Sequence, residues 1–527
     1  MSVKPSSDKK RILKGVSLSW LKFVLTLAIG VIQTPLLFKY LPKNELNAWY
    51  IFYSFGGFLL ISDLGLVTSI SRIIAYLDNA GNSQVDEKTI TDFRSYSTKQ
   101  IYSTSLFFFS IFLILFSITV TTAYYFLHRS ENPWVVLSFL IFIGGIVFNL
   151  LADVPTAVLN GFRDVGYDSM IRSSAQVVYF VILVIFLPHF KSIQFVSTAF
   201  LVQNLLVFIT LHFILKKRHK KVFEQALSFK ELIRVNIVKK VYSQSFPLAI
   251  NQVGTWLTTQ GSVVMASVVL GSNKLSDYAV NQQLFSYAVS ISLVINQIIG
   301  PFVAKQYIEN QKDNLITYYK NTTIASLCIV CLFLAALFSC CDYVIDLWIG
   351  PDHFLGYQFA IFFALITFFE VQHSVAGNFV WNMGKWPFNY WTVGSGLLNI
   401  LLAYVLGSRL GLFGIVIASF ASKIVTLNWY VVYYCLKKLG MSIVNYLKGV
   451  FIPVVVSVLC TVLVVLYIKG MLSRLTENKF LSIILISTVS TIIFVGMAII
   501  FFRKTLKPFW VMFRLKTGGI NPGSVGT

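Results

Sequence analysis

The chain has 527 residues, of which 56% are hydrophobic and only 12% are charged. Soluble domains carry about 25% charged residues, so this composition excludes a row of soluble domains and predicts an integral membrane protein. The formal net charge is +22. Because Lys and Arg gather in the cytoplasmic loops of membrane proteins and are attracted to anionic lipid head groups, this charge does not indicate nucleic acid binding.

Apolar windows long enough to cross a bilayer fill most of the chain. A helix needs about 20 mostly apolar residues to span the hydrocarbon core. Fourteen such windows begin near Ser17, Ala48, Ile101, Trp134, Ile171, Gln194, Gln244, Ser276, Asn321, Phe354, Trp391, Gly411, Gly449 and Leu481. No small-residue cleavage site follows the first window, so we expect a retained span and not a signal peptide. The sequence predicts an all-α polytopic membrane protein with about 14 transmembrane helices.

Basic residues assign the loops to the two sides of the membrane. The strongest basic block runs from Lys216 to Lys240, and both ends of the chain are basic as well. Because Lys and Arg collect in cytoplasmic loops, and an even number of spans returns the chain to the same side, we expect both termini in the cytoplasm. The prediction comprises a cytoplasmic N-terminus at 1–16, a basic cytoplasmic linker at 216–243 and a cytoplasmic tail at 503–527.

The chain also resembles itself. The segment Leu41–Trp49, after the first window, resembles Leu270–Tyr278, after the seventh, and two further short matches follow in the same order. This predicts two six-helix bundles at 17–215 and 244–435, with helices 13 and 14 at 436–502 outside the duplication. Six is an even number, so the two copies run in the same direction across the membrane. In such parallel repeats the substrate is expected between the halves, near the midplane.

Polar side chains inside the spans are the candidates for a wet, substrate-binding cavity. A charge at the bilayer centre costs about 2.5–3.5 kcal/mol, and such residues usually face a cavity or a partner. The candidates are Lys22, Gln33, Asp63, Arg72, Gln252, Gln283, Glu370 and Lys423. Lys22, Thr26 and Gln33 share one stripe of the first span by the helical period.

Each candidate has a structural alternative. A polar stripe can pack helices together in lipid, and Lys22 can extend its ammonium group to the membrane surface. Glu370 and Lys423 fall midway along spans ten and twelve, where they either face the cavity or pair with each other. Cys328 and Cys331 have the spacing of metal ligands, but no second pair or His cluster accompanies them, so we expect buried cysteines. The sequence predicts no metal site and no cofactor.

Several short motifs together resemble a known family. Ser62–Leu66 followed by Arg72, Leu159–Arg163 after span four, Phe246-Pro247, Leu347–Gly350 and Asn378–Lys385 occur in the order and positions found in polysaccharide-exporting flippases of the Wzx type. These flippases belong to the multidrug/oligosaccharidyl-lipid/polysaccharide exporter (MOP) superfamily. The resemblance covers nearly the whole chain. One departure is that many relatives place an acidic residue midway along span seven, where this chain has Gln260-Gly261-Ser262.

The resemblance implies a flippase and not an enzyme. Its substrate would be a polyprenyl-pyrophosphate-linked oligosaccharide, carried by alternating access from the cytoplasmic to the outer leaflet of a bacterial inner membrane for surface polysaccharides such as lipopolysaccharide O-antigen. The implied partners are membrane lipids, H⁺ or Na⁺ as coupling ion, and polysaccharide polymerase machinery. Lys22, Arg72 and Lys423 would offset the charge of the pyrophosphate, since desolvating an ion is costly.

Two other functions stay open on the sequence. The first is a drug or metabolite antiporter of the same superfamily, whose cavity should be acidic because its substrates are often cations. The second is a membrane-embedded polysaccharide polymerase or ligase. Such enzymes usually build their chemistry on a long external loop, whereas the longest predicted external loops here, 342–353 and 469–480, are short.

Overall fold

The structure is a computed structural model that describes residues 5–60, 66–78, 96–128, 132–164, 166–224, 234–271, 274–384, 386–472 and 478–517. Across these residues the regular secondary structure is helical. The chain forms two compact units, residues 1–276 with 389–415, and residues 277–388 with 416–527. The grouping of spans 1–6 and 7–12 into two six-helix bundles stays a prediction.

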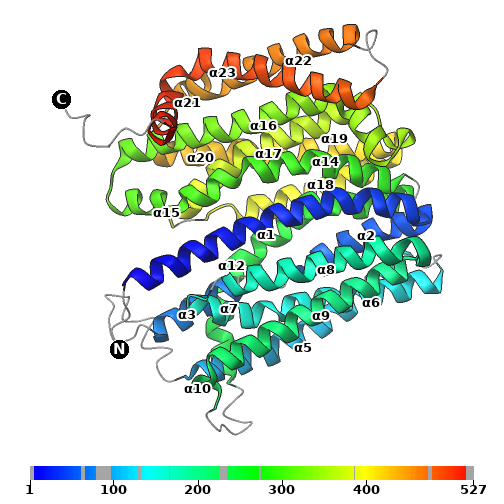
Figure 1. The fold of residues 1–527 in the computed structure, drawn as a ribbon, viewed down its shortest axis with the longest axis vertical. Helices are drawn as coiled ribbons and strands as arrows, with labels where there is room; N and C mark the ends of the chain where they lie inside the picture. The colour runs from blue at the N-terminus through cyan, green and yellow to red at the C-terminus, as the bar shows by residue number, and fades with distance from the viewer. Residues whose placement is uncertain are drawn as a thin grey trace. The chain divides into compact units, whose positions relative to one another are not determined.

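The first unit contains α1 (Pro5–Tyr40), α2 (Lys43–Leu60), α3 (Leu66–Asp78), α5 (Thr98–Leu127), α6 (Pro133–Leu151), α7 (Asp153–Gly161), α8 (Gly166–Phe190), α9 (Ile193–Arg218), α10 (Lys220–Phe223), α12 (Val235–Thr259), α13 (Gly261–Leu270) and α18 (Asn389–Leu410). Within it α1 lies along α8, α6 packs on α9, and α12 packs on α18 (Figure 1). The pairing of α1 with α8 brings together the polar faces described below.

The second unit contains most of α14 (Leu275–Ser292), then α15 (Val294–Ile308), α16 (Lys312–Ile349), the 3₁₀ turn η2 (Pro351–His353), α17 (Tyr357–Asn382), α19 (Leu412–Lys423, from Val416 on), the π-helix η3 (Ile424–Asn428), α20 (Trp429–Leu439), α21 (Ile443–Tyr446), the π-helix η4 (Leu447–Phe451), α22 (Ile452–Leu472) and α23 (Lys479–Thr517). Helices α22 and α23 lie side by side and both pack on α16 (Figure 1).

Local sequence signals explain where several helices begin and end. Ser97 and Gln100 form a reciprocal capping box at the start of α5, and Asn132 caps α6 just before Pro133 at the first helical position. These groups satisfy backbone N–H donors that the first helical turn leaves free. Gly440 ends α20 with a φ of 73°, a left-handed conformation that glycine adopts without a steric penalty.

Eleven helices of the described chain are long and apolar enough to cross a membrane, or up to twelve if one bent pair counts as a single span. The prediction of a multi-pass all-α membrane protein is confirmed, whereas the count of fourteen is not. The predicted spans two and eight correspond to α2 and α14, which have 18 residues each and are not among the eleven. The bent pair is the predicted span seven, in which α12 and α13 meet at 46°.

Candidate functional site

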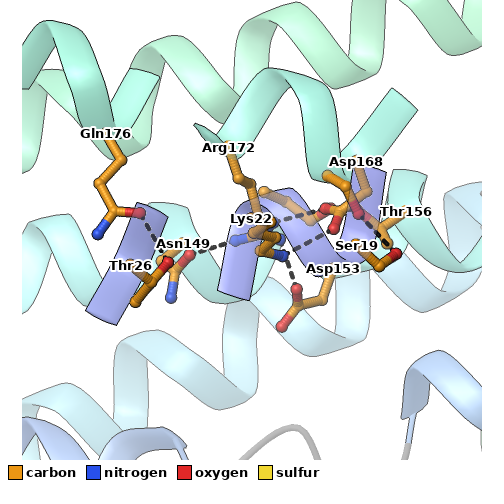
Figure 2. A network of polar contacts seen from close by, with 11 residues as sticks. Ser19, Lys22, Thr26, Asn149, Asp153, Thr156, Asp168, Arg172 and Gln176 are labelled. Carbon is orange, nitrogen blue, oxygen red and sulfur yellow. Dashed lines mark hydrogen bonds and ion pairs between the residues drawn. The ribbon is translucent and has the colours of Figure 1, made fainter. Parts of the chain in front are cut away.

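The polar stripe of α1 meets a complementary polar stripe on α8 (Figure 2). Lys22 Nζ donates to Asp168 Oδ2 at 3.0 Å, and Thr26 Oγ1 donates to Gln176 Oε1 at 2.9 Å. Two turns further along, Gln33 Nε2 donates to the Tyr179 hydroxyl at 3.3 Å. The 3.6-residue period places these side chains on one face of each helix, so the predicted stripe acts in this structure as a helix-to-helix contact.

Asp168 and Arg172 are the centre of this cluster, because they link α8 to three other segments. Arg172 Nε donates to Asp168 Oδ1 at 2.5 Å, and Arg172 Nη2 donates to Asp153 Oδ1 of α7 at 2.6 Å. The second terminal nitrogen of Arg172 donates to Asn149 Oδ1 of α6. Thr156 Oγ1 adds a hydrogen bond to Asp168 Oδ1 at 2.9 Å. We call the group of Lys22, Asp153, Asp168 and Arg172 the α1–α8 ion cluster.

The α1–α8 ion cluster holds two cations and two carboxylates, so its formal charges cancel. The side chains of Asp168 and Arg172 are only 14% and 16% exposed, whereas that of Lys22 is 34% exposed. Pairing and hydrogen bonding of this kind make a buried charge tolerable in a low-dielectric environment. Lys22 is therefore the member of the cluster that an incoming anion can reach with the least rearrangement.

The broken span seven forms a second polar junction in the first unit. The amide oxygen of Gln260, at the break, accepts from the Ser54 hydroxyl of α2 at 3.3 Å, and Trp256 Nε1 donates to the Ser54 carbonyl at 2.8 Å. Asn399 Nδ2 of α18 donates to the Leu257 carbonyl and to the Ser262 hydroxyl, both at 2.9 Å. A side chain that bonds backbone near a helix break makes the break tolerable inside a membrane.

A close approach of two backbones holds this junction together. A Cβ atom added to Gly254 of α12 would lie 2.5 Å from the Thr392 carbonyl carbon and 2.6 Å from the Val393 nitrogen of α18. Only glycine fits at this distance, as is common where helices pack in membranes. Thr392 Oγ1 also donates to Asn251 Oδ1 at 3.0 Å, so α12 and α18 are joined along their length.

The second unit contains the other pair of charges expected deep in the membrane. Lys423 Nζ donates to Glu370 Oε2 at 2.7 Å, with side chains 8% and 26% exposed, and His373 Nε2 lies 3.8 Å from Glu370 Oε1. The π-helix Ile424–Asn428 begins directly after Lys423. Single π-turns inside α-helices are frequent at functional sites. Of the two alternatives for Glu370 and Lys423, the structure shows the ion pair.

The other predicted residues lie apart from these clusters. Arg72 on α3 and Gln252 on α12 are exposed. Gln283 on α14 is half-buried and its amide nitrogen donates to the hydroxyl of Tyr287. Asp63 lies outside the described residues. The proposed role of all eight residues in binding a substrate stays a prediction. Among the seven of them that the structure describes, it joins Glu370 and Lys423 in an ion pair.

The carboxyl group of Asp164, at the turn between α7 and α8, has a lowered pKa. Burial alone would raise the pKa of the Asp164 carboxyl, but hydrogen bonds from His219 and Arg218 hold that pKa below its usual value of 3.8. Arg218 Nε lies 3.0 Å from Asp164 Oδ2, and its guanidinium also covers the ring of Tyr167. Asp164 thus fastens this turn to the end of α9.

Sequence reasoning missed Asp168, Arg172 and Asn399. Asp168 and Arg172 stand four residues apart with opposite charges, which resembles an ordinary exposed pair on one helix. Their burial depends on α1 and α7, which periodicity within α8 does not reveal. The signal that could have found Asp168 and Arg172 is their place near the start of a predicted span.

Two family models match overlapping ranges of the chain. A model described as polysaccharide biosynthesis protein matches residues 12–306, and a model described as MatE matches residues 247–405. No match was found among the curated proteins.

Solved structures of membrane transporters resemble the fold. The lipid II flippase MurJ in an inward closed conformation matches with a TM-score of 0.69 at 14% identity, over 93% of this chain and 99% of that chain. An inward-facing multidrug resistance MATE family transporter of the MOP superfamily matches with a TM-score of 0.57 at 15% identity, over 81% and 98%. A MOP superfamily transporter from Pyrococcus furiosus, described as having a binding pocket of reverse polarity, matches with a TM-score of 0.53 at 14% identity, over 82% of this chain and 96% of that chain.

The chain shares the fold of these membrane transporters. The chain belongs to the polysaccharide biosynthesis protein family, whose model covers more than half of its length.

Proposed function

We propose that this protein is a flippase of the Wzx type. It moves a polyprenyl-pyrophosphate-linked oligosaccharide from the cytoplasmic to the outer leaflet of a bacterial inner membrane, for surface polysaccharide synthesis. The observation that carries the proposal is the match to the polysaccharide biosynthesis family over residues 12–306. That range contains the whole α1–α8 ion cluster.

The charges of this cluster suit an anionic head group. A pyrophosphate cannot enter hydrocarbon without partners, because desolvating its charges is costly. Lys22 is the most exposed member of the cluster and is held by one carboxylate, Asp168. When a pyrophosphate draws Lys22 away, Asp168 keeps its contacts with Arg172 and Thr156 and is not left unpaired. The cluster can therefore exchange one anion for another at little cost.

The remaining parts of the proposal concern topology and partners. Both termini lie in the cytoplasm, so that the basic linker 216–243 faces the anionic lipids of that leaflet. An inside-negative potential favours outward movement of an anion by about 2.3 kcal/mol per charge per 100 mV. Arg72 and Lys423 are further cations for the pyrophosphate, and the flipped product passes to polysaccharide polymerase machinery. The coupling ion is considered in the next section.

An antiporter of drugs or metabolites is the second candidate. The MatE model, which matches residues 247–405, favours it, as does the fold shared with multidrug resistance transporters. Drug tolerance of an overexpressing strain separates the two functions. A rise in tolerance together with normal polysaccharide in a deletion strain would favour the antiporter.

The first test of the flippase is lipid extraction from a deletion strain. We expect lipid-linked oligosaccharide to accumulate and the gene to relieve the accumulation. Lys22→Ala should fail to relieve it, Lys22→Arg should relieve it in part, and Lys39→Ala should relieve it fully. Lys39 is the matched control, since it is an exposed lysine in the last turn of α1. Full relief by Lys22→Ala would remove this residue from the site.

A further inference from the structure

The neighbourhood of Glu370 contains two acceptor atoms that face each other without a proton between them. His373 Nδ1 lies 3.1 Å from the Phe369 carbonyl oxygen. A carbonyl only accepts, so in the neutral ring Nδ1 carries the hydrogen and Nε2 has the lone pair. That Nε2 lies 3.8 Å from Glu370 Oε1, which also only accepts when the carboxyl is ionised.

The second oxygen of Glu370 is already engaged. Lys423 Nζ contacts Oε2 at 2.7 Å, and the Lys423 side chain is 8% exposed. The charges of Glu370 and Lys423 therefore cancel, while the other oxygen, Oε1, keeps room for a donor. One added proton on His373 Nε2 would supply that donor and give the group a net charge of +1.

A buried hydrogen-bond acceptor lies close to Lys423 along the chain. In the described part of the chain, Asn428 Oδ1 is buried and has no hydrogen-bond partner. Asn428 ends the π-helix that starts after Lys423. Residues five apart are joined by the hydrogen bonds of a π-helix, so Asn428 lies about one turn from Lys423. A buried amide oxygen without a donor is costly, which favours a second state in which Lys423 fills it.

We propose that Glu370 and His373 together bind one exchangeable proton between Oε1 and Nε2, and that Lys423 moves from Glu370 to Asn428 when the proton is bound. The proton comes from water and returns to water, and no covalent bond between heavier atoms changes. The Glu370 side chain is 26% exposed, and the proposal requires that this exposed part meets water. As the driver of transport, this site rests on the proposed flippase function and selects H⁺ over Na⁺.

No other charge competes at this place within the described residues. The electrostatic partners of Glu370 are Lys423 and His373 alone. The helices packed on α17 bring other titratable groups, which are not among these partners: Lys305 on α15, Tyr319, Lys320, Cys328 and Cys331 on α16, and Cys435, Lys437 and Lys438 on α20. Tyr446 of α21 contacts α17 through its hydrogen bond with Gln372 and is not among them either.

Proton uptake by the purified protein in lipid nanodiscs tests the binding site without any substrate. A pH-sensitive dye measures the protons taken up between about pH 8 and pH 5, the range in which histidine titrates. We expect Glu370→Gln to take up about one proton fewer than the wild type, because His373, whose side chain is only 12% exposed, then loses its carboxylate partner and stays neutral.

Two further variants make this result decisive. Glu309→Gln is the matched control, since Glu309 is a carboxylate of the same unit in an exposed pair with Lys305, and its uptake should equal that of the wild type. Glu370→Gln with Lys423→Met removes both charges and should also lose about one proton. Unfolding would expose buried histidine and increase the uptake, so it cannot imitate the expected loss. Uptake by Glu370→Gln equal to the wild type would overturn the proposal.

Asn428→Leu tests the movement of the lysine. Without its second acceptor, Lys423 should hold Glu370 more firmly, so the same proton should bind at a lower pH. An uptake curve that coincides with the wild type would refute the transfer to Asn428.

Transport assays in proteoliposomes test the coupling. One coupled proton changes the transmembrane ratio of substrate about tenfold for each unit of imposed pH difference, and Glu370→Gln should abolish this response. Flipping that ignores the pH difference would refute the coupling. Absence of flipping under every condition, with proton uptake as expected, would instead refute the proposed function and leave the proton site standing.

Discussion

Replacing Asp168 by alanine should destabilise the first unit strongly. Asp168 accepts hydrogen bonds from Lys22, Arg172 and Thr156. Its removal leaves Arg172 with Asp153 but takes the carboxylate away from Lys22. Breaking a buried ion pair by removing one partner costs about 3–5 kcal/mol. Because Lys22 is 34% exposed and regains some water, we expect the lower end, about 3 kcal/mol.

Glu224→Ala provides the matched control. Glu224 pairs with Lys220 at 3.3 Å on α10, but these side chains are 58% and 77% exposed. An exposed pair of this spacing is worth about 0.3–0.5 kcal/mol. Both variants remove one carboxylate from one ion pair, so they differ chiefly in burial.

The assay is reversible unfolding of the purified protein in mixed micelles, read as the free energy of unfolding. A double-mutant cycle that combines Asp168→Ala with Lys22→Met should give an interaction energy of about 0.5–3 kcal/mol. An Asp168→Ala variant that loses no more stability than Glu224→Ala would refute the reasoning that the α1–α8 ion cluster holds the helices together.

Two further predictions concern packing and pH. Gly254→Ala should lose about 1–3 kcal/mol, because its new methyl group meets the backbone of α18, whereas Gly394→Ala, with nothing within 4 Å, should leave the unfolding free energy equal or higher; equal losses would contradict this. Asp164 has a folded pKa below its usual value of 3.8, so its stabilising contribution is full above that value and is lost as pH falls through the folded pKa. An unfolding titration should therefore decline more steeply below about pH 4 in the wild type than in Asp164→Asn, and parallel curves would refute the assignment.

The sequence predicts that the chain is a membrane protein, because this depends on its composition. It also predicts the polar face of α1, because this depends on the helical period. The stripe of Lys22, Thr26 and Gln33 follows from the helical repeat alone, and all three side chains do bond to α8. The choice of α8 as partner does not follow, since it depends on which helices pack together. The sequence alone therefore does not single out Asp168.

The number of spans shows a second limit. Windows of hydropathy count α2 and α14 as spans, but these helices carry polar side chains and are not among the described helices that are apolar enough to cross a membrane. The bend between α12 and α13 falls at Gln260-Gly261-Ser262. At this place many flippases of the Wzx type are expected to have an acidic residue, which this chain lacks. A hydropathy window averages over such a break, whereas Asn399 bonds directly to the backbone beside it.

The most direct test of the central claim is the orientation of the lipid-linked oligosaccharide in intact spheroplasts, probed with a membrane-impermeant sugar-binding protein. With the wild-type gene or Lys39→Ala, the account predicts head groups on the outer face. In the deletion strain and with Lys22→Ala, it predicts head groups that become accessible only after the membrane is opened. Outward-facing head groups at wild-type levels in the deletion strain would contradict the flippase.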